Sequence, residues 1–136
     1  MDGVPDPELT AQVAAAAPFT TFLGIEMISA SPHEVIARLA WSEDTCTAGG
    51  VMHGGALMGL ADNVGGFCAF LNLPEHAAGT ATIESKTNFF AAVRSGHVRA
   101  VSRPLHTGRR TIVVDTDLYD ETGKLVARVT QTQAVL

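Results

Sequence analysis

The sequence predicts an α+β fold in which a curved, antiparallel six-stranded sheet wraps around one long central helix. Three observations lead to this prediction. Residues 51–71 form a long apolar segment in which Asp62 is the only residue charged at pH 7. Two β-rich segments precede it and four follow it. A helix that is apolar nearly all round must be covered on most sides, so the sheet has to curl around it.

The composition indicates one globular domain. The 136 residues are 46% hydrophobic and 17% charged, which is typical of a chain that buries a core. The net charge of −5 is unevenly divided, because residues 1–85 hold ten acids and one base (−9) and residues 86–136 hold four acids and eight bases (+4). This balance does not predict nucleic-acid binding, but the basic half could hold a small anionic ligand.

The N-terminal residues 1–18 are expected to form a helical extension before the main domain, residues 19–136. Pro7 suits a helix start and Pro18 suits a stop, so a short helix is expected at about residues 8–16. The first residues are acidic and lack the basic start of a secretory signal, and the two cysteines form no disulfide framework. We therefore expect a cytoplasmic protein.

The strands are predicted from alternation and turn residues. The first two are expected at residues 22–30 and 34–41, joined by a turn at residues 31–33. Four more are expected after the central helix, at residues 80–90, 98–105, 110–119 and 124–136. Short turns link the last three, which predicts an antiparallel meander in which Pro104 marks an edge or a bulge.

The central helix, expected to end near Asn72, has two unlike faces at about 100° per residue. One broad apolar stripe holds Leu57, Leu60, Ala61, Val64, Phe67, Cys68 and Leu71. The opposite narrow stripe holds Gly55, Gly59, Asp62 and Gly66. Helical glycines cost about 1 kcal/mol each relative to alanine and are tolerated where another segment or a ligand approaches the backbone. An acid on this stripe is a candidate for catalysis.

The length of residues 51–71 would also allow a membrane span. Asp62, Asn63 and His53 interrupt the apolar run, and no basic cluster flanks it. We therefore expect a core helix and no membrane association.

The turn His53-Gly54-Gly55 precedes the helix. The N–H groups and the positive dipole end at a helix start point outward, so Gly54 or Gly55 could stabilise a developing oxyanion. Asp62, two turns further along, would then face the same cleft. His53 is expected to orient the turn through a backbone hydrogen bond rather than to act as an acid or base. The histidines show no metal-binding spacing, so no metal site is expected.

Three segments carry a family resemblance: GGVMHGGALMGLADNVGG, TIESKTNFFAAVRSG and LHTGRRTIVVDTDLYDETGKLVARVTQTQAVL. With these segments, residues 19–136 resemble the hotdog-fold acyl-CoA thioesterases of the PaaI-like, phenylacetic-acid-degradation type. The resemblance implies hydrolysis of an acyl-CoA, with coenzyme A as part of the substrate and no cofactor. It also implies a homodimer, with dimers often paired into tetramers, and active sites at the dimer interface.

The resemblance also implies roles for single residues. The acid matching Asp62 serves as general base or nucleophile on the thioester. A backbone N–H after His53, from Gly54 or Gly55, polarises the thioester carbonyl, and the turn and the acid come from different subunits. Thr82 falls where related enzymes place a Ser or Thr that positions the water or the acid.

Further residues are candidates for substrate binding. Many relatives have an Asn or Gln shortly before the HGG turn, and Thr47 is the nearest substitute here. Arg109 and Arg110 follow a turn where they could meet the phosphates of coenzyme A, or they are ordinary strand-end charges. Candidates for the lining of an aryl or medium-chain acyl pocket are Met58, Phe89, Phe90 and Trp41.

Two alternative functions stay open. Hydration or dehydration of an enoyl thioester needs a histidine that moves a proton at carbon, and the body of the central helix has none. A non-catalytic acyl-CoA-binding protein is the second alternative, which the departure at Thr47 leaves open.

Overall fold

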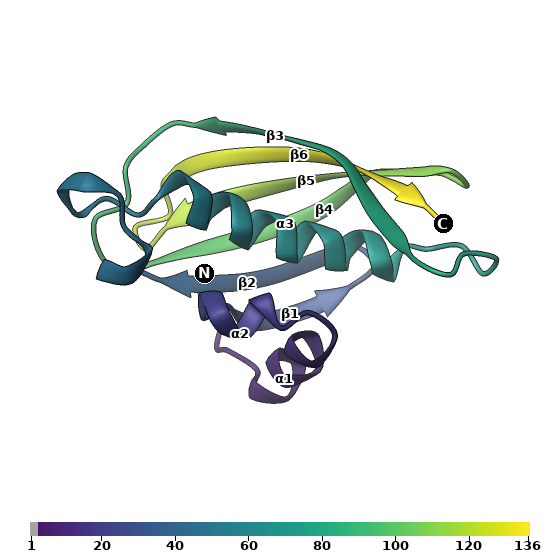
Figure 1. Ribbon diagram of the computed structural model, residues 1–136, viewed down its shortest axis with the longest axis horizontal. Helices are drawn as coiled ribbons and strands as arrows, with labels where there is room; N and C mark the ends of the chain where they lie inside the picture. Colours follow the sequence, from purple (N-terminus) through teal and green to yellow (C-terminus); the bar gives the residue numbers. More distant parts are fainter. Residues whose placement is uncertain (1–2) are drawn as a thin grey trace.

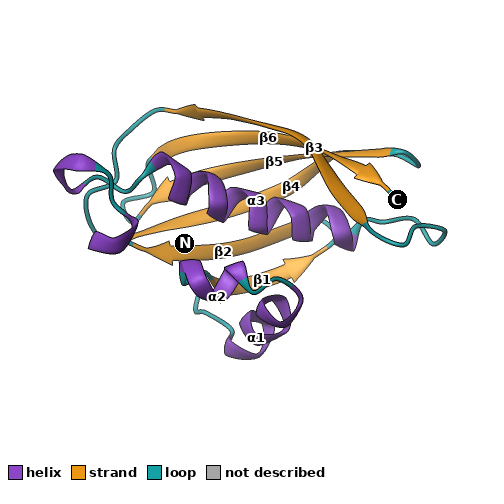
Figure 2. Cartoon of the chain, viewed as in Figure 1, coloured by secondary structure: helices purple, strands orange, loops and turns teal. Residues whose placement is uncertain are grey.

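The computed structural model describes residues 3–136 and confirms the predicted fold class (Figure 1). One antiparallel sheet has the strand order β1-β2-β4-β5-β6-β3. Its strands are β1 (Glu26–Ser31), β2 (Glu34–Ala40), β3 (Thr80–Phe89), β4 (His97–Thr107), β5 (Thr111–Asp120) and β6 (Leu125–Val135). The long helix α3 (Gly54–Leu71) lies against one face of this sheet (Figure 2). Met1 and Asp2, which begin the predicted extension, lie outside the described residues.

Helix α3 is the centre of the core and follows the predicted turn. Its buried residues are Ala56, Leu57, Leu60, Ala61, Val64, Gly65, Cys68 and Ala69. It has the length and hydropathy of a membrane span, but it contacts all six strands, which is the setting of a core helix. Burial raises the pKa of the Cys68 thiol to about 11, as expected for a core cysteine.

The N-terminal extension is helical as predicted, but the first strand is shorter than expected. Helix α1 (Pro7–Ala16) is capped by Asp6, whose Oδ1 accepts the N–H groups of residues 8 and 9 at 3.0 Å. The prediction of a strand from residue 22 was wrong, because Phe19–Leu23 form helix α2. Helix α1 ends before Pro18, as predicted, and Pro18, which has helical backbone angles, also precedes α2. Gly24 ends α2 with a φ of 85°.

The meander β4-β5-β6 is confirmed, and the turn between β1 and β2 falls at the predicted residues. Pro104 lies in a central strand, not at an edge, and the register against β5 shifts between Pro104 and His106. Of the two expectations for this proline, the bulge is therefore correct. Two short 3-10 turns, Glu43–Thr45 and Ala48–Gly50, occupy the loop between β2 and α3.

The two edges of the sheet differ. At the β1 edge, the N–H of Asp6 donates to the carbonyl of Met27 (2.8 Å), and the N–H of Met27 donates to Thr10 Oγ1 (2.9 Å). Strand β3 is the last strand on the opposite side, and no segment within residues 3–136 pairs with its outer edge. Its side chains are exposed along most of its length. An unpaired edge of this length is a template for a second chain.

Candidate functional site

The start of α3 is fixed by hydrogen bonds of His53. Its N–H donates to the carbonyl of Thr45 (2.7 Å), and its Nδ1 accepts the N–H of Gly55 (2.7 Å). The histidine therefore orders the turn as expected, and it occupies one of the two candidate oxyanion donors. Within residues 3–136, no group accepts a hydrogen bond from the N–H of Gly54. Gly54 is thus the donor that remains for an oxyanion.

A groove of about 280 Å³ opens beside Gly54. Its lining includes three of the predicted site residues, Thr47, Gly54 and Phe89. The ring of Phe89, at the end of β3, lies so close that a Cβ atom on Gly54 would be 3.0 Å from Cζ. The end of β3 and the start of α3 therefore form one surface around the N–H of Gly54.

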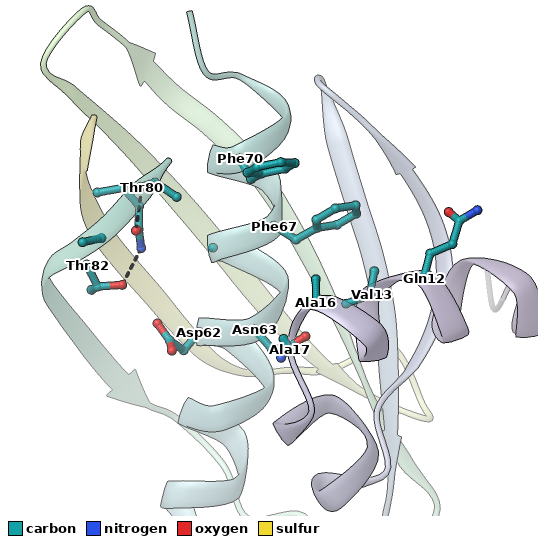
Figure 3. A pocket seen from close by; sticks show the side chains of 13 residues that line it. Gln12, Val13, Ala16, Ala17, Asp62, Asn63, Phe67, Phe70, Thr80 and Thr82 are labelled. Carbon is teal, nitrogen blue, oxygen red and sulfur yellow. Dashed lines mark hydrogen bonds between the residues drawn. The ribbon is translucent and has the colours of Figure 1, made fainter. Parts of the chain in front are cut away.

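Asp62 borders a separate and larger cleft of about 590 Å³ (Figure 3). The cleft runs across the open face of α3, between the predicted Thr82 on β3 and the side chains of Gln12 and Val13 on α1. The rings of Phe67 and Phe70 stack with centroids 6.4 Å apart and form an apolar part of its wall. The described chain leaves Asp62 exposed to this space.

Two buried amides of β6 support this cleft. Gln133 donates to Thr82 Oγ1 (2.7 Å) and accepts from Thr80 Oγ1 (3.0 Å; dashed lines in Figure 3). Gln131 donates through Nε2 to Asp62 Oδ1 (3.2 Å). The sequence analysis missed both glutamines. The segment TQTQ could have indicated them. Alternate residues of a strand face the same side, so Gln131 and Gln133 follow the buried Val129 toward the core.

The prediction that Asp62 and the turn face one cleft is wrong for a single chain. Asp62 follows Gly54 by eight residues on one straight element, so they are about 12 Å apart along the helix axis. They also line different clefts. One thioester group needs both within about 3 Å, so one chain does not bring acid and donor together.

Only part of the predicted glycine stripe on α3 is closely approached by another segment. A Cβ on Gly59 would lie 3.1 Å from Leu23 Cδ2, so α2 packs there. Gly66 faces open space in the cleft, with nothing within 4 Å. The closest approach is at Gly65, where a Cβ would lie 2.1 Å from Gln131 Oε1.

The remaining candidates lie away from both clefts. Met58 and Phe90 are exposed, and Arg109 and Arg110 are exposed in the turn before β5. The Trp41 indole N–H donates to the carbonyl of Gly50 (3.1 Å), with the ring packed on the core. His53 and Gly55 line a third cleft, of about 550 Å³, with residues of α2.

Comparison with known proteins decides the family. Residues 49–127, which include the turn, α3 and most of the sheet, match the thioesterase superfamily. The chain belongs to this superfamily. It is 34% identical to the 1,4-dihydroxy-2-naphthoyl-CoA hydrolase of Escherichia coli over 87 residues, which are 64% of this chain and 63% of that protein.

Solved structures of this superfamily share the whole fold. A mutant of thioesterase PA1618 from Pseudomonas aeruginosa superimposes with a TM-score of 0.87 at 28% identity, covering 98% of this chain and 95% of that one. A mutant of the phenylacetic acid degradation protein PaaI from Thermus thermophilus superimposes with a TM-score of 0.80 at 27% identity, covering 88% and 99%. The resemblance to hotdog thioesterases, PaaI among them, is therefore confirmed.

Proposed function

We propose that this protein hydrolyses acyl-CoA thioesters to a free acid and coenzyme A. The observation that carries the proposal is the position of Asp62, an acid on the open face of the core helix beside a cleft of about 590 Å³. The unpaired N–H of Gly54 on the same helix is the complementary group, because a helix start stabilises developing negative charge.

Asp62 acts as general base or nucleophile. As a base, it takes a proton from water, and the water oxygen attacks the thioester carbonyl carbon. As a nucleophile, it forms an acyl anhydride that water then opens. In both routes the N–H of Gly54 binds the oxyanion, the C–S bond breaks, and the thiol leaves with a proton. Thr82 Oγ1, which accepts a hydrogen bond from Gln133, is proposed to hold the water or the acid.

The complete site contains residues of two chains. Acid and donor are about 12 Å apart along α3, so a second copy must supply the missing partner at each thioester. The open edge of β3 offers the surface for that copy, and Phe89 at its end lies against Gly54. We therefore propose a homodimer with two equivalent sites, and a dimer of dimers as the larger assembly.

The proposed substrate is an aryl or medium-chain acyl-CoA. The stacked rings of Phe67 and Phe70 give the cleft beside Asp62 an apolar wall on which such a group would pack. The exposed guanidinium groups of Arg109 and Arg110 are proposed to meet phosphates of coenzyme A. The free thiols of Cys46 and Cys68 fit the reducing cytoplasm, the compartment we propose.

The test is thiol release from a panel of aryl- and medium-chain acyl-CoAs by the wild type and by Asp62→Asn. The expected result is turnover by the wild type and a fall of about 10²-fold or more in the variant. Equal rates would remove Asp62 from the mechanism. Binding of acyl-CoA without thiol release would support a binding protein instead, and hydration of an enoyl-CoA without thiol release would support a hydratase.

A further inference from the structure

Gln131 contacts the proposed catalytic acid from inside the protein. It lies on β6 and has an exposed fraction of 0%. Its Nε2 donates to Asp62 Oδ1 at 3.2 Å, and within residues 3–136 this is the one hydrogen bond of the Asp62 side chain. Without this contact, an aspartate on the open face of a helix would rotate freely between staggered conformers.

The same amide leaves a polar atom without a partner. Gln131 Oε1 is buried and has no hydrogen-bond partner among the described residues. A buried acceptor without a donor lowers stability, whereas an apolar side chain of similar size would avoid that loss. Rotating the amide by half a turn would place Oε1 against the carboxylate of Asp62, and two acceptors would then repel each other. The amide is therefore oriented by Asp62.

The helix is shaped to admit this side chain. Gly65 packs over the amide, and a Cβ at this position would lie 2.1 Å from Oε1 and 2.8 Å from Cδ. A glycine in the middle of a helix weakens that helix. Both the glycine and the unpaired oxygen thus act against stability, and both accompany the contact between Gln131 and Asp62.

We infer that Gln131 is a positioning residue that holds Asp62 Oδ1 and leaves Oδ2 directed to the reacting group, a role that rests on the proposed function of Asp62. Gln131 does not touch the substrate, because it is fully buried, with Gly65 of α3 packed over its amide.

The test uses Gln131→Met, which keeps the length of the side chain and removes both polar atoms. The expected result is a kcat that falls roughly 10- to 100-fold, the range for a hydrogen bond to a charged group. KM stays within about twofold, because substrate contacts are unchanged. Tm does not fall, because the variant also removes the buried Oε1 that has no partner among the described residues. Thr132→Val, next on β6 and on its opposite face, is the matched control and keeps wild-type kinetics.

Gln131→Glu provides an independent measurement. It keeps the shape of the side chain but replaces the donor beside Asp62 Oδ1 with an acceptor. The kcat is expected to fall at least as far as in Gln131→Met, with KM again within about twofold. An unchanged kcat in both variants, with Asp62→Asn inactive, would overturn the role of Gln131 and leave the proposed function standing. Full activity of Asp62→Asn would instead overturn both.

Discussion

The Nδ1 atom of His53 accepts the N–H of Gly55 at 2.7 Å. This bond caps α3 with a side chain and removes Gly55 from the candidate oxyanion donors. The N–H of Gly54, one residue earlier, is left without an acceptor in the described chain. The histidine thereby selects which backbone group is available to the substrate.

Replacing Gly54 by proline deletes this donor with little cost to the helix. Proline is favoured at the first helical position, and His53 already has the extended angles φ −61° and ψ 137° that precede a proline. The expected result is a kcat lower by about 10²- to 10³-fold. Gly54→Ala is the control, because it adds the same Cβ beside Phe89 but keeps the N–H. A similar fall in kcat in both variants would show that the added Cβ beside Phe89, and not the loss of the N–H donor, reduces activity.

The basic turn before β5 is expected to recognise the phosphates of coenzyme A. Replacing Arg109 and Arg110 together by alanine should raise KM for an acyl-CoA about five- to tenfold. KM for the corresponding N-acetylcysteamine thioester, which has no phosphate, should not change. Arg128→Ala is the control, since Asp117 binds its guanidinium at 2.6 Å. A KM that rises equally for both substrates would contradict a phosphate contact.

The buried Cys68 thiol predicts a loss of stability at high pH. Its pKa is raised to about 11 in the folded protein, whereas an unfolded thiol ionises near 8.5. As the pH rises, the unfolded state therefore loses the thiol proton first. The contribution of Cys68 to the free energy of unfolding is complete below pH ~8.5. It disappears between roughly pH 8.5 and 11, with a loss of about 3 kcal/mol in the free energy of unfolding.

Urea unfolding at several pH values measures this loss. Cys68→Ala should lack the part of the pH dependence that the wild type shows above pH ~8.5. Cys46→Ala, which removes the half-buried free thiol of the loop, should keep it. If the free energy of unfolding falls equally with pH in all three proteins, groups other than Cys68 cause the loss of stability.

The open edge of β3 predicts self-association. Ile83 is 61% exposed on this strand, and a charge there would be buried if two copies of β3 pair. We expect the wild type to sediment as a dimer or larger, and Ile83→Glu to sediment as a folded monomer. Val4→Glu changes an equally apolar exposed residue, 83% exposed on the N-terminal segment, and should not alter the sedimentation. A monomeric wild type would refute the shared site.

The parts of the fold that could be predicted depend on local patterns. The ends of α3 follow from a glycine turn and from Asn72, and β4, β5 and β6 follow from alternation between short turns. Helix α2 could not be predicted in this way. Its five residues are too few to show a helical period, and only Gly24 and Ile25 separate them from the first strand.

The candidate site was predictable only where one helix carries it. Asp62 stood out because it is the single acid on an apolar helix. Its contact with Gln131 joins residues 69 positions apart, and it depends on the position of β6 relative to α3, which the sequence pattern does not contain. For the same reason the pattern placed Gly66, and not Gly65, in the stripe of close approach, whereas the side chain of Gln131 on β6 lies against Gly65.

The two edges of the sheet also bear on where the proposed assembly would stop. Asp6 and Thr10 already occupy the outward N–H and carbonyl of Met27, so the chain closes its own β1 edge. Growth by strand pairing is then possible only at β3. Two copies joined there would present a closed edge at each end of the shared sheet, and no further strand could add. The short N-terminal helix is thus expected to prevent the open-ended strand pairing that would produce filaments.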